Sequence, residues 1–309
     1  MAVTYSKILR LVVLMVFLVS CLVGTAVADD LKGYQKIIWK QLEVVTAFGP
    51  RPPGSPALNK LRAYIKKVGK KYADEVHEQP FTYQQRPGGP SVAMANIELV
   101  FHGQSNKAPL LLGAHYDTRP FADEEKDEYS RRFPIVGAND GGSGTAVLLG
   151  LAQYLHTHKP QRPVRLVFFD GEDYGVKHSS NYFLGSKHYA AQLKKTDRTQ
   201  WPYAVLIIDM VADKDLKISR ETYSHENASW MLKIVMDAAK RQNATAFLNP
   251  PKHTVRDDHL PFIGIGIPAA VLIDFDYTHW HTLQDTLDKC SAESMFTVFS
   301  VVVEAMGKI

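Results

Sequence analysis

Short apolar segments alternate along the chain with longer segments whose apolar residues recur at helical spacing. The predicted strands are Asn96–Phe101, Leu110–Ala114, Val164–Phe169, Ala204–Ile208 and Ala269–Ile273. The predicted helices between and after them are Ser143–His156, Ser180–Lys194, His225–Gln242 and Ala292–Met306. Strands that are apolar throughout and separated by helices indicate a largely parallel sheet covered on both faces. We therefore predict an α/β fold: one three-layer α/β/α domain with a central mixed, mostly parallel sheet.

The region before this alternation predicts two helices joined by a turn. Segment Leu31–Phe48 has helical spacing, and Gly49–Gly54 is rich in proline and glycine. Ser55 can cap a second helix that runs to about Tyr72. Further along, Phe121–Phe133 is charged and lacks periodicity, which predicts a surface loop near the site.

The first 28 residues have the pattern of an export signal. Lys7 and Arg10 precede an apolar run over Leu11–Val23, and Ala26–Val27–Ala28 offers a small-x-small cleavage site. The run is shorter than the roughly 18–20 residues that span a bilayer. We predict a signal peptide over residues 1–28, one catalytic domain over residues 29–309, and a secreted or periplasmic mature protein.

A lipoprotein is the alternative to soluble export. Leu18–Val19–Ser20–Cys21 resembles a lipobox, which would leave a lipid anchor on Cys21. The chain has two cysteines, so either cleavage leaves Cys290 without an intramolecular disulfide partner. No reactive context surrounds Cys290, and we expect a packed side chain there.

Charge and composition exclude two broad classes of protein. The formal net charge is +4, and Lys7 and Arg10 of the predicted signal contribute two of these charges. So small an excess excludes a strongly basic nucleic-acid binder and gives no reason to expect an anionic-membrane partner. Hydrophobic content of 45% and charged content of 22% are values of a globular protein rather than a disordered one.

Histidines and carboxylates follow the predicted strands where each strand ends. They are His115 and Asp117, Asp170 to Asp173, Asp209, Asp274, and His279 to His281. Open α/β sheets bind ligands at the carboxyl ends of their strands, so we expect these side chains to converge at one edge.

Imidazole and carboxylate without thiolate suit a catalytic zinc site that keeps a position open. The adjacent pair Glu172–Asp173 suits such a site, because one carboxylate can bind the metal while its neighbour transfers protons. The glycine-rich turn Gly137–Gly144 is neither a dinucleotide fingerprint nor a P-loop. Its glycines let the backbone bend so that Asp140 points into the site.

The ordered set of these motifs resembles the zinc exopeptidase and glutaminyl cyclase superfamily. The matching pieces are His115-x-Asp117, Gly137–Asp140, Gly171–Asp173, Asp209 and Trp280–Thr282. The resemblance extends from Gly49–Arg51 to the last predicted helix. The closest likeness is to secreted bacterial glutaminyl cyclases of the animal type.

The resemblance implies two alternative metal contents. In the cyclase version, Asp140, Asp173 and His281 hold one zinc ion. In the aminopeptidase version Asp140 bridges two zinc ions, and His115 and Asp209 complete the second site. All five ligands are present, so the inventory leaves both versions open. The resemblance further implies a cis peptide bond directly after Asp140.

The cyclase version also implies roles for four other residues. Glu172 would move a proton from the α-amine of an N-terminal glutamine to departing ammonia. Asp209 and Asp257 would form a carboxylate network around the leaving amide, and Trp280 would pack against the substrate side chain. In the aminopeptidase version, Glu172 would activate water instead. Peptide or protein N-termini are the expected substrates of either enzyme.

Overall fold

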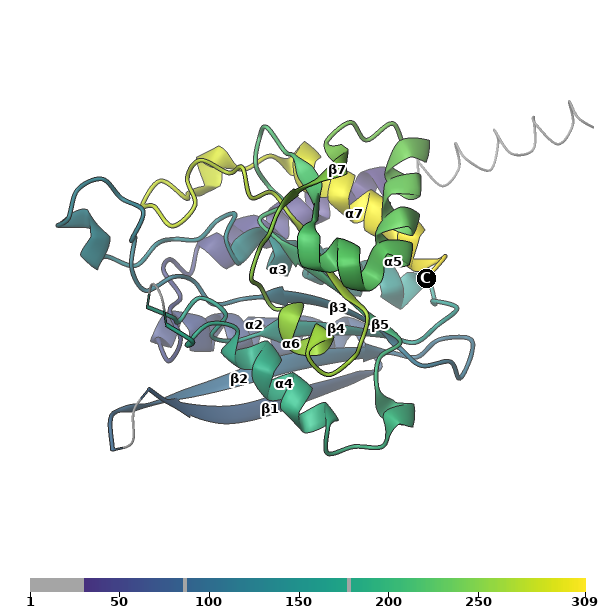
Figure 1. Ribbon diagram of the computed structural model, residues 1–309, viewed down its shortest axis with the longest axis horizontal. Coiled ribbons are helices and arrows are strands. Elements are labelled where there is room, and N and C mark those ends of the chain that lie inside the picture. The colour runs from purple at the N-terminus through teal and green to yellow at the C-terminus, as the bar shows by residue number, and fades with distance from the viewer. Residues whose placement is uncertain (1–30, 86–87, 177–178) are drawn as a thin grey trace, which may run out of the picture.

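A six-stranded sheet forms the centre of the computed structural model, which describes residues 31–85, 88–176 and 179–309 (Figure 1). The strand order is β1-β2-β4-β3-β5-β8. The strands are β1 Glu75–Gln84, β2 Ser91–Phe101, β3 Leu110–His115, β4 Val164–Phe169, β5 Ala204–Asp209 and β8 Ala269–Ile273. Strands β4, β3, β5 and β8 pair in parallel, whereas β2 is antiparallel to both β1 and β4. The predicted mixed, mostly parallel sheet is confirmed.

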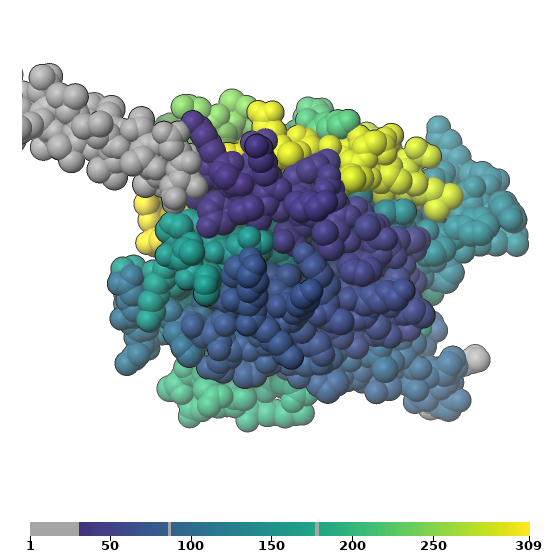
Figure 2. Space-filling model, turned by 180° about the vertical axis from the view of Figure 1, so that it is seen from behind, coloured from purple at the N-terminus to yellow at the C-terminus, as the bar shows by residue number. Residues whose placement is uncertain are grey.

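Helices cover both faces of this sheet, so the predicted three layers are also confirmed. On one face lie residues 31–46 and the helices α2 Pro56–Tyr72, α3 Gly142–Thr157, α5 Thr222–Arg241 and α7 Ala292–Met306. On the other lie α4 Leu184–Leu193 and the short α6 Leu260–Ile263. Alternate strand residues feed the two cores: Leu110 and Leu112 face the first, and Leu111 faces the second. In Figure 2 the purple N-terminal helices lie between the yellow C-terminal segment and the blue strands.

Side-chain caps set the starts of α2 and α5, and α4 and α5 begin three or more residues away from the predicted starts. Ser55 accepts a hydrogen bond from the Leu58 N–H at 3.1 Å and caps α2, as predicted. Helix α5 begins at Thr222, before the predicted start, because the Glu221 side chain caps it. Helix α4 begins only at Leu184, because Phe183 has a left-handed backbone with φ 58°.

Three strands were not predicted. Strand β1 lies at the sheet edge with alternating exposed and half-buried residues, unlike the apolar central strands. The parallel pair of β6 Ile218–Glu221 and β7 Phe247–His253 forms a small second sheet. Strands β1 and β7 are largely exposed or half-buried, so they lack the continuous apolar runs used to find the central strands, and β6 is only four residues long, with the polar sequence Ser-Arg-Glu after Ile218.

The N-terminal predictions concern residues outside the described part of the chain. The proposed signal peptide and the lipobox alternative at Cys21 both lie there. Within the described ranges, no helix is both long and apolar enough to cross a membrane. Cys290 is a buried free thiol, as expected, and burial raises its pKa.

Candidate metal and catalytic site

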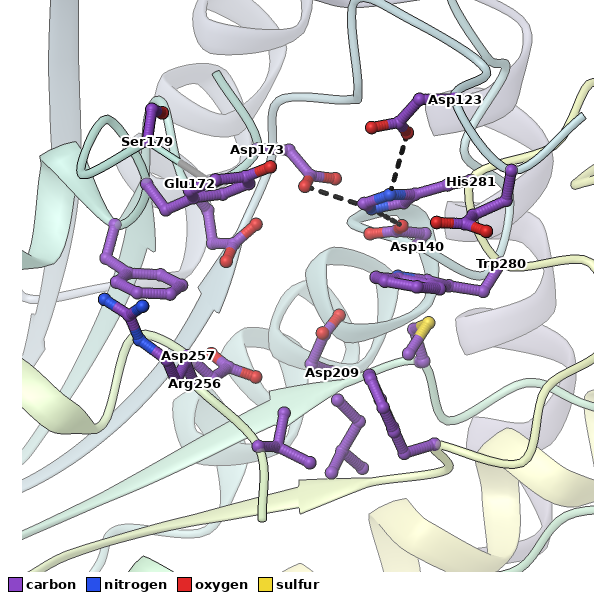
Figure 3. A pocket seen from close by; sticks show the side chains of 17 residues that line it. Asp123, Asp140, Glu172, Asp173, Ser179, Asp209, Arg256, Asp257, Trp280 and His281 are labelled. Carbon is purple, nitrogen blue, oxygen red and sulfur yellow. Dashed lines mark ion pairs between the residues drawn. The ribbon is translucent and has the colours of Figure 1, made fainter. Parts of the chain in front are cut away.

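The carboxyl ends of the parallel strands open into a cavity of about 260 Å³ (Figure 3). Its lining includes seven of the residues singled out in the sequence: Asp140, Glu172, Asp173, Asp209, Asp257, Trp280 and His281. They come from the ends of β4 and β5, the turn before α3, the loop before α6, and the loop after β8. His115, at the end of β3, is buried beside them at 1% exposure without lining the cavity.

The predicted single-zinc ligands form a compact buried group. One ligand atom each of Asp140, Asp173 and His281 lies within 4.8 Å of the others. The Nε2 atom of His281 is 3.4 Å from Asp140 Oδ2 and 3.2 Å from Asp173 Oδ1. The Trp280 ring stacks on the His281 ring with centroids 3.9 Å apart. Trp280 therefore covers the imidazole while still lining the cavity.

A second group shares Asp140 with the first. His115 Nε2 lies 3.2 Å from Asp140 Oδ1 and 3.2 Å from Asp209 Oδ1. The three side chains again offer ligand atoms within 4.8 Å of one another. Another such group joins His115 to Glu172 and Asp173. Both predicted metal-ligand sets are thus spatially compact.

Backbone geometry explains how Asp140 reaches the site. Gly141 has φ 77°, and a Cβ there would collide with the Asp117 carbonyl oxygen and lie 2.9 Å from the His115 ring. Asp285 accepts the backbone N–H groups of Asn139 at 2.9 Å and of Asp140 at 3.0 Å. The peptide bond after Asp140 is trans, so the prediction of a cis peptide bond there is wrong. A glycine with positive φ turns the chain here instead.

Asp117 fixes the adjacent acidic pair. Its carboxylate accepts the backbone N–H of Glu172 at 3.1 Å and of Asp173 at 3.2 Å. Gly171, with φ 75°, turns the chain into this arrangement directly after β4. The aspartate of the His115-x-Asp117 motif therefore positions the pair and is not one of the clustered ligands.

Sequence reasoning missed an arginine–aspartate pair behind His281. Asp123 Oδ1 lies 3.2 Å from His281 Nδ1, on the ring edge away from the two ligand carboxylates. Arg119 donates to both Asp123 oxygens, at 3.0 and 2.6 Å, and to the Asp173 carbonyl oxygen at 3.0 Å. The buried Arg119 guanidinium thus contacts both the Asp123 carboxylate behind His281 and the backbone of Asp173, so it helps to position two candidate metal ligands. The sequence signal for this pair was the spacing of four residues between Arg119 and Asp123, directly after the His115 motif.

Burial and mutual repulsion shift the pKa values of these acids. Burial and then the Asp173 charge raise the pKa of Asp140 to about 7 and that of Glu172 well above its usual range. Burial and then Asp209 raise the pKa of Asp257 to about 7. Burial lowers the pKa of His281, but Asp173 and the other carboxylates outweigh burial and raise it to about 9. The site therefore concentrates negative charge that is poorly compensated by the protein.

Unsatisfied buried atoms indicate that this charge awaits a cation. Asp140 Oδ2 and Asp173 Oδ2 are buried and have no hydrogen-bond partner among the described residues. A cation between the carboxylates would supply the missing partner and offset their repulsion. Imidazole with carboxylate oxygens is a zinc-type donor set, so the residues present fit zinc.

Comparison with known proteins defines the class. The model of peptidase family M28 matches residues 96–306. This chain belongs to peptidase family M28. The match begins within β2 and extends to the last residue of α7, so it includes all residues of the candidate site. It does not include residues 31–46, α2 or β1.

Individual relatives narrow the likeness within that family. The glutaminyl-peptide cyclotransferase of Gloydius blomhoffii is 25% identical over 82% of this chain and 76% of its own length. The glutaminyl cyclase structure of Fimbriiglobus ruber is 31% identical, with a TM-score of 0.83, over 88% of this chain and 94% of that chain. A structure described as a leucine aminopeptidase precursor from Bacteroides thetaiotaomicron is 27% identical over 89% of this chain and 97% of its own, with a TM-score of 0.84. The resemblance to glutaminyl cyclases within the zinc exopeptidase superfamily is confirmed.

Proposed function

We propose that this protein is a zinc-dependent glutaminyl-peptide cyclotransferase, which converts N-terminal glutamine of peptides into pyroglutamate and releases ammonia. The observation that carries the proposal is one small cavity with the buried Asp140, Asp173 and His281 group at its floor and Glu172 beside it. The likeness to glutaminyl cyclases supports the same reaction.

The reaction is intramolecular and needs no co-reactant. The α-amine nitrogen forms a bond to the carbon of the side-chain amide, the bond from that carbon to its nitrogen breaks, and ammonia leaves. Glu172 takes a proton from the amine and returns it to the leaving nitrogen. Its place among buried acids favours the neutral form that must donate this proton.

The remaining residues hold the substrate in a cyclised shape. Asp209 and Asp257 line the cavity together and would accept hydrogen bonds from the leaving amide. Trp280 supplies an apolar wall that folds the glutamine side chain back toward the amine. The conformational entropy of the side chain is then lost on binding rather than in the chemical step. Asp140, Asp173 and His281 would hold one zinc ion, and the ion would act as a Lewis acid toward the amide carbonyl.

A zinc aminopeptidase is the second candidate, because one observation favours it. The His115, Asp140 and Asp209 group shares Asp140 with the first group, as a two-metal site requires. In that enzyme Glu172 would activate water against the peptide carbonyl. The measured ratio of zinc to chain separates the two: one for the cyclase and two for the peptidase.

We also propose that the mature enzyme is exported. The support is the basic, apolar and small-residue pattern of residues 1–28. Cleavage after Ala28 would release a soluble enzyme, and lipidation of Cys21 would anchor it. N-terminal sequencing and mass analysis of the native protein distinguish these products.

A paired turnover assay on purified protein tests the proposed activity. One tripeptide amide begins with glutamine and its match begins with leucine, and both are incubated with the wild type and Glu172→Gln. We expect ammonia release from the glutamine peptide, with the peptide bond intact, and a loss of roughly 10²–10⁴-fold in the variant. Release of free leucine or free glutamine would instead establish an aminopeptidase. Zinc content of the variant should match the wild type, because Glu172 is not one of the three proposed ligands.

A further inference from the structure

The mouth of the cavity carries an arginine that the proposed reaction does not use. Among the lining residues, Glu124 and Arg256 are the exposed ones, and the others are buried or half-buried. Arg256 makes no hydrogen bond or ion pair with any other described residue. A cation that lines a site and lacks a protein partner is available to a ligand.

The backbone on either side of Arg256 is fixed. The preceding Val255 N–H donates to Glu221 Oε1 at 3.1 Å, and the following Asp257 is buried at 3% exposure. Figure 3 shows Arg256 across the cavity from Trp280 and His281. The backbone of Arg256 is therefore held at one side of the opening, next to the proposed catalytic residue Asp257, and its side chain extends from this fixed point.

The buried lining is acidic, whereas the exposed lining carries one charge of each sign, Glu124 and Arg256. The buried lining includes five acids, namely Asp140, Glu172, Asp173, Asp209 and Asp257, which suit a metal ion and the ammonium end of a peptide. A second basic residue, Lys187, lies near the lining, because its Nζ is 5.5 Å from the ring centroid of the lining residue Phe183. Lys187 donates to the Ser180 carbonyl oxygen at 2.8 Å, so it is engaged with its own loop. Arg256 is left as the free positive charge on this side.

The size of the cavity determines which part of a peptide reaches Arg256. About 260 Å³ is below the roughly 300–1,000 Å³ of sites for drug-sized ligands. An N-terminal glutamine would fill such a space, and the next residue would then lie at the mouth. We propose that Arg256 binds a substrate carboxylate directly beyond the N-terminal glutamine. This is either the side chain of an acidic second residue or the terminal carboxylate of a dipeptide, and the inference rests on the proposed function.

The test compares peptides that differ only in this charge. The tripeptide amides carry glutamate, glutamine or lysine after the N-terminal glutamine, and glutaminyl-alanine is used with a free or an amidated end. For the wild type at low salt, we expect kcat/KM for the acidic peptide to exceed that for the neutral one roughly two- to fivefold, mainly through KM. The preference should shrink at high salt, because the pair is exposed.

Matched variants test whether Arg256 causes the preference for acidic peptides. Arg256→Gln should make the acidic and neutral peptides equal, and Arg256→Glu should favour the lysine peptide. Lys195→Gln is the control, because it removes the same charge from an exposed residue outside the cavity lining and should keep the preference. A preference confined to the dipeptides would assign the terminal carboxylate as the ligand.

Two results would overturn the proposal. One is equal kcat/KM in the wild type within both comparisons, that is, between the glutamate and glutamine tripeptide amides and also between free and amidated glutaminyl-alanine. The other is a preference that survives in Arg256→Gln. Failure of the cyclase itself gives a different result, namely no ammonia from any peptide. Calorimetric titration with the same peptides then still decides the role of Arg256. Tighter binding of the acidic peptide to wild type than to Arg256→Gln supports it, and equal binding contradicts it.

Discussion

The imidazole of His281 is held between carboxylates on both ring edges. Nε2 faces Asp140 and Asp173, and Nδ1 faces Asp123 at 3.2 Å. A carboxylate behind a metal-binding histidine fixes which nitrogen carries the proton and how the ring points. Arg119 in turn holds both oxygens of Asp123, so the orientation does not depend on one exposed contact.

Asp123→Asn should weaken zinc binding. The amide keeps the size of the side chain but removes the charge that orients His281 and pairs with Arg119. We expect zinc affinity to fall roughly 10- to 100-fold, measured by competition with a coloured chelator. Asp127→Asn is the matched control, because Asp127 is an exposed acid of the same loop that accepts the Ser130 N–H at 2.8 Å. Equal zinc affinity in both variants would show that other contacts orient the ring.

The sequence predicted the candidate ligands but not the residues behind them. Asp140, Asp173 and His281 follow strands or glycine-rich turns, and that position predicts convergence at the sheet edge. Asp123 lies in an aperiodic charged loop, and its partner His281 is far away along the chain. Contacts of that kind exist only after folding, so neither periodicity nor motif spacing reveals them.

At the scale of elements, Glu221 joins three segments near the cavity mouth. Its Oε1 accepts the N–H groups of Tyr223 at 2.9 Å and Val255 at 3.1 Å. Its Oε2 accepts the Ser224 N–H at 2.7 Å. The carboxylate thereby ends β6, starts α5 and pins the loop that carries Arg256.

Glu221→Gln should destabilise the fold in a pH-dependent way. Burial raises the pKa of Glu221, but His259 and the α5 N–H groups outweigh burial and lower it to about 2, against a usual 4.5. Its contribution to stability is therefore complete above about pH 4.5 and lost as the pH falls from there toward 2. A glutamine has one acceptor oxygen where Glu221 uses two, so we expect a loss of about 1–2 kcal/mol at pH 7.

Urea unfolding of both proteins at pH 7 and at successively lower pH measures this. The difference between wild type and variant should narrow below pH 4.5. Glu226→Gln, an exposed acid of the same helix, should change little at any pH. A difference that stays constant down to the lowest pH at which both proteins fold would contradict a charge-based role for Glu221.

The elements differ in how well the pattern predicted them. Val164–Phe169, Ala269–Ile273 and Ala292–Met306 have the predicted bounds, because continuous apolar runs and a Ser291 cap mark them. Strand β1 contains Pro80 and polar residues, and it is a strand because β2 pairs with it along its whole length. Neighbouring strands supply what the local sequence lacks there.

At the scale of the whole molecule, the sheet is a rigid support for repulsive charge. The central strands are almost fully buried between two apolar cores, and their carboxyl ends bring together several buried acids. Bringing unpaired carboxylates together at low exposure costs stability, and the cores must outweigh that cost. A bound cation would remove part of the repulsion, so metal content should set the stability of the entire fold.

Removal of zinc should therefore lower the melting temperature reversibly. At a free zinc concentration 100 times Kd, binding to the folded state alone contributes about 2.7 kcal/mol, which corresponds to a shift of roughly 5–10 °C for a domain of this size. Calorimetry before and after chelation measures the shift, with metal analysis of the same samples giving zinc per chain. Restored zinc should restore the melting temperature, whereas magnesium should not, because it binds imidazole poorly. In Asp173→Asn, which loses a proposed ligand, the shift should be much smaller. A wild-type melting temperature that stays constant while zinc per chain falls to zero would show that the acidic cluster does not depend on the ion for stability.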